Sequence, residues 1–181
     1  MKHTDIVELS HLLLKEHISP RDIVVDATMG NGQDTMFLAK HAKHVYAFDI
    51  QRIALTHTIN LLTKNNLSNV TLFHESHEHI SALVPEFKGV VFNLGYLPTG
   101  DHDITTTNET TLFSLHMILS LLHKDGFVLM VVYPGHEKGL EEAMALDDYL
   151  SHVDHQAFAV IKIDMPYQKN KPPYILFIKK R

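Results

Sequence analysis

Five short apolar runs, separated by stretches with helical periodicity, constrain the fold of this chain more than any other feature of its sequence. Near-continuous apolar runs of this length, rich in Val, Ile and Phe, are typical of parallel strands that are buried on both faces. Their regular alternation with helices predicts an α/β fold built on a parallel sheet. The five runs are Ile23–Ala27, His44–Asp49, Val70–His74, Gly89–Leu94 and Gly126–Tyr133.

The last third of the sequence departs from this alternation. After a helix expected near Glu137–Leu150, two apolar runs, Ala157–Asp164 and Tyr174–Lys179, have only the proline-rich segment Met165–Pro173 between them. Two strands joined by such a loop predict an antiparallel hairpin. We therefore expect a seven-stranded, doubly wound α/β sheet with an antiparallel last strand.

The whole chain is expected to form a single domain over residues 1–181, beginning with an amphipathic helix within residues 1–20. We find no internal repeat, low-complexity tract or linker that would divide it. A helix around Leu115 is expected to start with a capping box formed by Thr106 and Glu109. The dipeptide Asp125-Gly126 is expected to end that helix.

The most informative segment is the loop after the first apolar run, which reads DATMGNGQD over residues 26–34. Its two glycines permit positive φ angles and the close approach of a ligand, and the helix that follows offers free backbone N–H groups. The dinucleotide fingerprint G-x-G-x-x-G fails at its third position, where Thr35 stands. Asp26 and Asp34 would repel a pyrophosphate, but they suit a ligand that carries an ammonium group.

The end of the second apolar run favours a nucleoside ligand. Asp49 stands 23 residues after Asp26, and a carboxylate at this place accepts hydrogen bonds from both ribose hydroxyls. Gln51 is placed to bond the ribose or the adenine. A ligand with a ribose and an ammonium-bearing tail but no phosphate is S-adenosylmethionine (SAM). The alternative is that the glycines only form a tight turn.

Histidines gather where the third apolar run ends, in the segment HESHEH at residues 74–79. His74, His77 and His79 suggest a metal site, but their spacing matches no standard zinc motif, so no metal is expected. The loop after the third strand of such a sheet lies near the adenine, which makes Ser76 and His77 candidate cofactor contacts. The predicted cofactor contacts are Asp26, Thr28, Gly30, Asn31, Gly32, Gln33, Asp34, Asp49, Gln51, Ser76 and His77.

The segment at residues 26–34 and a second segment, NLGYLP at residues 93–98, together resemble a known family. The pattern is similar to class I SAM-dependent methyltransferases, which have a Rossmann-like fold. It is more closely similar to the MnmM family of tRNA 5-(aminomethyl)-2-thiouridine methyltransferases, formerly described as rRNA methylases. The resemblance extends over nearly the whole chain. It departs from the family pattern after Pro98, where Thr99-Gly100 stands in place of Gly-Gly.

The resemblance implies an enzyme that transfers a methyl group from SAM to nitrogen and releases S-adenosylhomocysteine (SAH). The implied substrate is the wobble uridine at position 34, in the anticodon loop of tRNA. The reaction would convert its 5-aminomethyl group to a 5-methylaminomethyl group.

The segment NLGY at the end of the fourth apolar run resembles the Asn-Pro-Pro-Tyr motif of methyltransferases that modify amino groups. The Asn93 side-chain oxygen and the Leu94 carbonyl are candidate acceptors for the amine, and they would aim its lone pair at the methyl carbon. Tyr96 is a candidate to stack on the base. The alternative is that Asn93 only ends a strand and Tyr96 only packs. An aliphatic amine must lose a proton before it attacks, and His136 and Asp103 are alternative acceptors for it.

The charge of the chain is unevenly placed. The segment Lys162–Arg181 holds six of the 16 basic residues and one acidic residue, so it carries +5. The rest of the chain has 10 basic and 20 acidic residues, which makes −10 and gives the net charge of −5. This basic segment is either a solvated surface or a binding surface for single-stranded RNA, which is held by stacking and phosphate contacts. The predicted substrate contacts are Tyr133, His136, Tyr167, Lys169 and Lys171.

Composition excludes several other classes of protein. The chain has no cysteine, which rules out disulfide scaffolds, thiolate zinc sites and cysteine nucleophiles. No apolar run reaches the roughly 20 residues that span a bilayer, and no signal peptide is recognisable, so no membrane partner and a cytoplasmic location are expected. A homodimer is among the expected assemblies, because small methyltransferases that bind a large RNA often dimerise.

Three other functions remain compatible with the sequence. They are a small-molecule N- or O-methyltransferase, an rRNA methyltransferase, and a non-catalytic protein that binds SAM or SAH. A nicotinamide-dependent oxidoreductase is disfavoured, because Thr35 replaces the third glycine and Asp34 would oppose a pyrophosphate.

Overall fold

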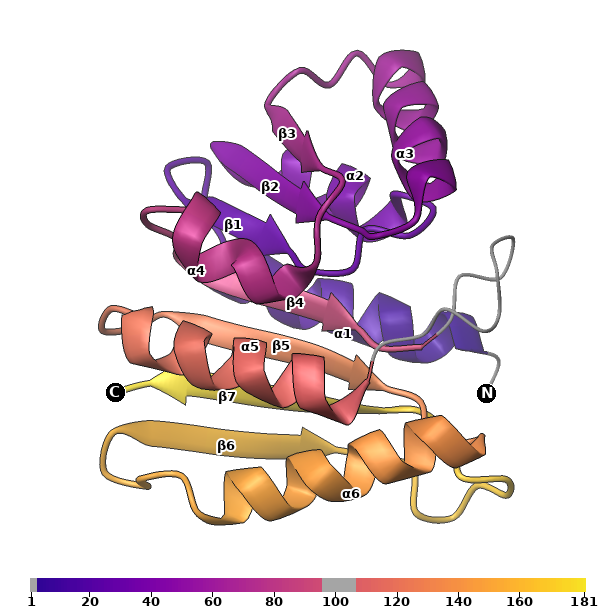
Figure 1. Ribbon diagram of the computed structural model, residues 1–181, viewed down its shortest axis with the longest axis vertical. Helices are drawn as coiled ribbons and strands as arrows, with labels where there is room; N and C mark the ends of the chain where they lie inside the picture. Colours follow the sequence, from indigo (N-terminus) through magenta and orange to yellow (C-terminus); the bar gives the residue numbers. More distant parts are fainter. Residues whose placement is uncertain (1–2, 96–106) are drawn as a thin grey trace.

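The computed structural model describes residues 3–95 and 107–181 as one seven-stranded sheet with helices on both faces (Figure 1). The strands are β1 (Ile23–Asp26), β2 (His44–Phe48), β3 (Val70–Phe73), β4 (Gly89–Asn93), β5 (Phe127–Val132), β6 (Phe158–Ile163) and β7 (Tyr174–Lys180). The α-helices are α1 (His3–His17), α2 (Gln33–Ala39), α3 (Arg52–Lys64), α4 (Ile80–Leu83), α5 (Asn108–Leu121) and α6 (Glu137–Ser151), and a 3₁₀ turn, η1, spans His77–His79.

The strand order is β3-β2-β1-β4-β5-β7-β6. The first five strands are parallel, whereas β7 runs antiparallel to both of its neighbours. The predicted α/β fold with an antiparallel final hairpin is therefore confirmed. The chain proceeds outward from β1 to β3 on one side and from β4 to β5 on the other. Ligands bind at such a reversal, beyond the carboxyl ends of the strands.

Each face of the sheet has its own apolar core, because successive strand side chains point to opposite faces. On one face, strand residues such as Val25 and Phe92 pack with α4, α5 and α6. On the other face, Val24 and Val91 pack with α1 and α2. Figure 1 shows the first set of helices in front of the sheet and the second set behind it. Both faces of the central strands are thus covered, which explains their continuous apolar runs.

The ends of α5 differ from the sequence prediction. Thr107, not Thr106, is the N-cap, and its hydroxyl oxygen accepts a hydrogen bond from the Thr110 amide at 3.3 Å. Thr106 lies outside the described residues. The helix ends at Leu121, before Asp125-Gly126, where Asp125 adopts a φ of 64° in the turn that leads into β5. Consecutive threonines make the choice of cap ambiguous from sequence alone.

No helix in the described part of the chain combines the length and the apolar character needed to cross a membrane.

Candidate active site

The loop between β1 and α2 is shaped by two glycines with positive φ angles. Gly30 has a φ of 50° and Gly32 has a φ of 80°. A Cβ atom on Gly32 would lie 2.7 Å from the Thr58 hydroxyl oxygen and 3.0 Å from the Thr58 Cα atom of α3. The second glycine is therefore required by the close packing of this loop on α3, in addition to its backbone conformation.

Asp26, at the end of β1, lies beneath this loop and is fully buried. Its carboxylate accepts a hydrogen bond from the Thr35 hydroxyl at 2.6 Å and another from the Thr28 amide at 3.2 Å. Burial, and secondarily the charge of Asp34, raise the pKa of Asp26 to about 7. The structure thus buries Asp26 against this loop, where its carboxylate bonds Thr35 and Thr28.

Asp49, which follows β2, has its carboxylate fixed by the backbone. One oxygen accepts a hydrogen bond from the Gly30 amide at 2.9 Å, and the other accepts one from the Gln51 amide at 2.8 Å. Burial raises the pKa of Asp49 above its usual value. A carboxylate has about four lone-pair positions, so this geometry leaves acceptor capacity for a ligand hydroxyl. Gln51 itself is the N-cap of α3.

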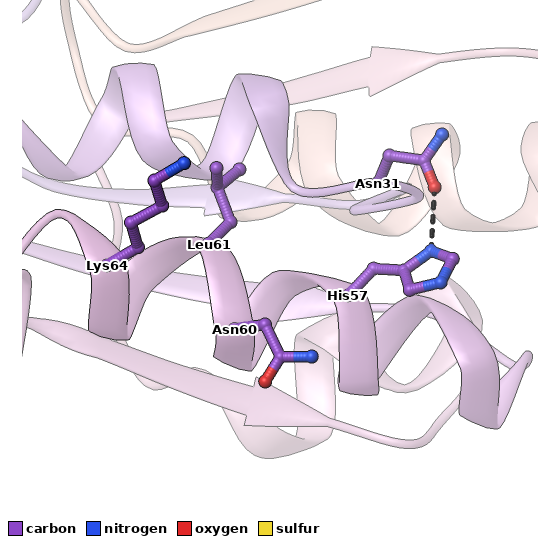
Figure 2. Close-up of a pocket in the computed structure, with 5 residues that line it drawn as sticks. All are labelled: Asn31, His57, Asn60, Leu61 and Lys64. Carbon is purple, nitrogen blue, oxygen red and sulfur yellow. Dashed lines mark hydrogen bonds between the residues drawn. The ribbon is translucent and has the colours of Figure 1, made fainter.

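The Asn31 side chain turns toward α3. Its amide oxygen lies 3.0 Å from Nδ1 of His57, and both residues line a hollow that also includes Asn60, Leu61 and Lys64 (Figure 2). Asn31 was predicted as a cofactor contact, and the structure places its side chain on the α3 side of the glycine loop. Gln33, the first residue of α2, is exposed.

The loop after β3 carries Ser76 and His77. Ser76 caps η1, since its hydroxyl oxygen accepts a hydrogen bond from the Glu78 amide at 3.2 Å. His77 is only 9% exposed, and its ring makes an edge contact with Phe92. Burial lowers the pKa of His77 to about 4, so the ring is neutral at pH 7. Its Nε2 atom is buried and has no hydrogen-bond partner in residues 3–95 and 107–181.

Asn93, at the end of β4, joins the ends of several elements. Its amide N–H donates to the Thr28 hydroxyl oxygen at 2.7 Å, and its side-chain Nδ2 donates to Asp34 Oδ2 at 3.0 Å. The Asn93 side chain also bonds Tyr133, whose pKa is raised to about 12, chiefly by burial. The neighbouring Leu94 is buried, and its amide donates to the Val131 carbonyl at 2.8 Å.

His11, on α1, completes this network and was not singled out by the sequence analysis. Its Nε2 atom lies 2.7 Å from Asp34 Oδ1, and its ring stacks on Phe37 with a centroid separation of 3.9 Å. The sequence does indicate that His11 lies near the core, because it stands next to the buried helical stripe that contains Ser10 and Leu14. The partner 23 residues away was not visible in that pattern.

Tyr133 and His136 belong to the turn between β5 and α6. His136 is the N-cap of α6, and its Nδ1 atom accepts a hydrogen bond from the Gly139 amide at 3.0 Å. A Cβ atom on Gly139 would lie 2.1 Å from the Tyr133 carbonyl oxygen, so this glycine is required where the turn closes on itself. His136 was expected as an acceptor for the substrate proton; in the structure its Nδ1 atom caps α6.

The loop between β6 and β7 reaches the same end of the sheet. Val132, the last residue of β5, pairs with Tyr174, the first residue of β7. The carbonyl oxygens of Asn170 and Lys171 lie 3.9 Å and 3.8 Å from the position of a Cβ atom on Gly135. Tyr167 in this loop is 99% exposed, and Lys169 and Lys171 are also exposed.

The rest of the basic segment lies elsewhere. Phe127, the first residue of β5, pairs with Lys179, so Lys179 and Lys180 lie at the opposite end of the sheet. Lys179 also lies 3.3 Å from Asp125, and Lys162 lies 2.8 Å from Asp147. Of the six basic residues in Lys162–Arg181, only Lys169 and Lys171 lie in the loop beside the β5–α6 turn.

Two predicted residues, Tyr96 and Asp103, lie outside the described residues. Among those described, no group of three or more His, Asp and Glu side chains is arranged to hold a metal ion. His79 lies 3.0 Å from Glu75, and His74 Nε2 lies 2.9 Å from the Ile50 carbonyl oxygen.

The residues at the carboxyl end of the sheet fit SAM. Asp49 supplies an acceptor for a ribose hydroxyl, and the unsatisfied Nε2 atom of His77 supplies a polar contact for the base. Asp49 bonds the glycine loop directly, because its carboxylate accepts a hydrogen bond from the Gly30 amide.

Comparison with known proteins agrees with this chemistry. Residues 45–179 match the family model described as "Putative rRNA methylase". A curated Arabidopsis thaliana protein, the chloroplastic tRNA (mnm(5)s(2)U34)-methyltransferase, is 35% identical in an alignment of 191 positions that covers 96% of this chain and 69% of that protein.

Two solved structures share the fold at appreciable sequence identity. A "putative methyltransferase" from Streptococcus mutans in complex with SAH is 38% identical, with a TM-score of 0.91 over 97% of this chain and 98% of that one. A "putative rRNA-methylase" from Clostridium thermocellum is 39% identical, with a TM-score of 0.94 over 97% of each chain. The chain therefore belongs to the rRNA methylase family of SAM-dependent methyltransferases.

Proposed function

We propose that this protein methylates the 5-aminomethyl group of the wobble uridine of tRNA, with SAM as the methyl donor. The observation that carries the proposal is the Asn93 amide, which is held in one orientation beside the glycine loop by Asp34. An amide acceptor at this place suits an amine substrate. The plant relative named for the same tRNA position supports the choice of substrate. We also propose that residues 1–181 act as one domain, since a single sheet includes every strand of the described residues.

The reaction is an in-line displacement. SAM supplies a methyl group on a sulfonium; the amine nitrogen forms the new bond with the methyl carbon, and the electron pair of the broken carbon–sulfur bond stays on sulfur. The amine must be neutral when it attacks, so an ammonium substrate first releases one proton to water. Asn93 contributes by accepting a hydrogen bond from the amine, which orients its lone pair. A positioned acceptor of this kind requires no strong base.

Recognition of the RNA is assigned to the β6–β7 loop. Lys169 and Lys171 offer cations for phosphates, and the fully exposed ring of Tyr167 offers a stacking platform. The loop borders the turn that contains Tyr133 and His136. An anticodon loop held there would direct its splayed wobble base toward Asn93.

Methyl transfer to defined acceptors tests the proposal. Purified protein is incubated with radiolabelled SAM and with three acceptors: bulk tRNA from a strain that lacks the activity, rRNA, and a panel of small amines. We expect label in tRNA, in a nucleoside that chromatographs as 5-methylaminomethyl-2-thiouridine. Label in small amines or rRNA but not in tRNA would contradict the proposed substrate.

The Asn93→Ala variant tests the role of the amide. It should bind SAM with an affinity close to that of the wild type, while kcat falls by about 100-fold because the amine is no longer aligned. A wild-type kcat in this variant would show that Asn93 does not align the amine. Wild-type protein that binds SAM and transfers no methyl group would support a non-catalytic role.

A further inference from the structure

The Asn93 amide group lies within a chain of contacts that begins on α1. His11 Nε2 lies 2.7 Å from one oxygen of the Asp34 carboxylate. The other Asp34 oxygen accepts a hydrogen bond from Asn93 Nδ2 at 3.0 Å. His11 thereby connects α1 to the end of β4, although the two residues are far apart in the sequence.

These contacts determine which end of the Asn93 amide is available. Burial raises the pKa of the Tyr133 hydroxyl, and the hydrogen bond between this hydroxyl and the Asn93 side chain acts in the opposite direction. The Nδ2 end of the amide faces Asp34, to which it donates. The carbonyl oxygen Oδ1, at the other end of the amide, therefore faces away from the Asp34 carboxylate and is the end that can accept a hydrogen bond from a substrate amine.

His11 also determines what Asp34 offers to an amine. A carboxylate with an unpaired oxygen binds an ammonium group strongly, because charge-assisted hydrogen bonds are about twice as strong as neutral ones. Such a contact would hold the substrate amine at Asp34 in its protonated, unreactive form. With His11 on one oxygen and Asn93 on the other, Asp34 keeps fewer free lone-pair positions for an ammonium group, and its carboxylate holds the amide in place.

We propose that His11 is a positioning residue for methyl transfer, which acts through Asp34 to present the Asn93 carbonyl oxygen to the substrate amine. This inference rests on the proposed function, since it assumes that an amine is the acceptor. It makes α1 part of the active site. It also assigns Asp34 to the amide rather than to the cofactor tail.

Three single variants separate the hydrogen bond from packing. His11→Phe keeps an aromatic ring on Phe37 but removes the donor, whereas His11→Gln keeps an N–H donor of similar reach. The matched control is His41→Phe, because His41 also packs on the Phe37 ring, at 4.5 Å, and its Nδ1 atom contacts the Phe37 carbonyl rather than Asp34. For each variant, kcat and KM for tRNA, the Kd for SAM, and the side-chain amide signal of Asn93 in a ¹⁵N–¹H spectrum are measured.

We expect His11→Phe to lower kcat by at least about tenfold with little change in the Kd for SAM, since misplaced reacting groups cost rate rather than cofactor binding. His11→Gln should restore most of that loss, and His41→Phe should match the wild type. The Asn93 amide signal should shift in His11→Phe and stay in place in His41→Phe.

Two results would overturn the inference. One is a His11→Phe variant with wild-type kcat and an unshifted Asn93 signal. The other is an equal loss of kcat in His11→Phe, His11→Gln and His41→Phe, which would assign the effect to packing on Phe37. If the wild type methylates no tRNA, the proposed function fails, and the Asn93 signal still reports whether His11 orients the amide.

Discussion

Two buried titratable side chains next to the candidate site, His77 and Asp26, respond to pH in opposite directions. Burial lowers the pKa of His77 from its usual 6.5 to about 4, so the folded protein holds this ring neutral. Asp26, in contrast, keeps its proton to a higher pH in the folded protein than in the unfolded chain, because its pKa is raised from 3.8 to about 7. Their contributions to the pH dependence of folding therefore oppose each other between pH 4 and pH 6.5.

The His77→Phe variant should isolate the histidine contribution. Between pH 6.5 and pH 4 the unfolded chain takes up a proton on His77 that the folded protein refuses, so acidification favours unfolding of the wild type. The free energy of unfolding of the wild type, relative to His77→Phe, should fall by up to about 3 kcal/mol over this range. Urea denaturation without cofactor at several pH values measures it.

Asp26→Asn is the matched control for this experiment. The contribution of Asp26 is present at low pH and is lost as the pH rises through 7, so the stability difference between wild type and Asp26→Asn should change in the opposite sense. Denaturation midpoints of wild type and His77→Phe that follow parallel pH curves would refute the assignment of a depressed pKa to His77.

At the level of single residues, the sequence indicated which side chains gather near the site but not the direction in which they point. The spacing placed Asp26, Asp34 and Asp49 at strand and loop ends, where the structure has them. It did not indicate that Asp26 faces inward to Thr35, or that Asn31 faces His57. Such orientations depend on tertiary contacts between residues nine or more positions apart, and these leave no local pattern.

At the level of elements, the turn between β5 and α6 depends on a glycine whose replacement has two opposing effects. Gly139 lies in the first turn of α6, where alanine normally stabilises a helix by up to about 1 kcal/mol relative to glycine. The alanine Cβ atom would, however, lie 2.1 Å from the Tyr133 carbonyl oxygen and 2.8 Å from the His136 ring. Overpacking against backbone outweighs helix propensity.

We therefore expect Gly139→Ala to lower the free energy of unfolding by at least about 2 kcal/mol, measured by urea denaturation. Gly135→Ala is the matched control in the same turn. Its Cβ atom would approach its nearest neighbours at 3.8 Å and 3.9 Å, which is ordinary contact, so its stability should stay within about 0.5 kcal/mol of the wild type. A Gly139→Ala variant that is as stable as Gly135→Ala would contradict the tight closure of this turn.

The order and direction of the strands followed from the sequence, because the period of apolar residues changes between strand and helix and because prolines mark the last loop. The role of α1 did not follow in the same way. The amphipathic pattern predicted a helix there, and the structure confirms α1 at His3–His17. That α1 packs against the sheet so that His11 reaches Asp34 depends on the packing of Ile6 and Leu14 in a core shared with β1, β4 and β5.

At the scale of the whole molecule, the sheet divides the basic segment into two regions. Lys169 and Lys171 lie in the loop that borders the candidate site, whereas Lys179 and Lys180 lie beyond the amino end of β5. The net charge of −5 therefore says little about RNA binding, because a phosphate responds to the local field within about 10 Å. The two regions carry similar charge at opposite ends of the sheet, so they form a natural pair for comparison.

The double variant Lys169→Gln/Lys171→Gln should weaken tRNA binding, because each lysine that contacts a phosphate releases a counterion on binding. We expect a higher Kd for tRNA at every salt concentration tested. The slope of log K against log salt should be shallower by about 1.4, because each of the two lysines contributes about 0.7 on single-stranded RNA. The Kd for SAM should not change.

The control, Lys180→Gln/Arg181→Gln, removes the same charge from the other end of the sheet. It should leave the Kd for tRNA and its salt dependence near the wild type. An equal loss of tRNA affinity in the two double variants would show that net charge governs binding. It would also show that the β6–β7 loop is not the RNA contact.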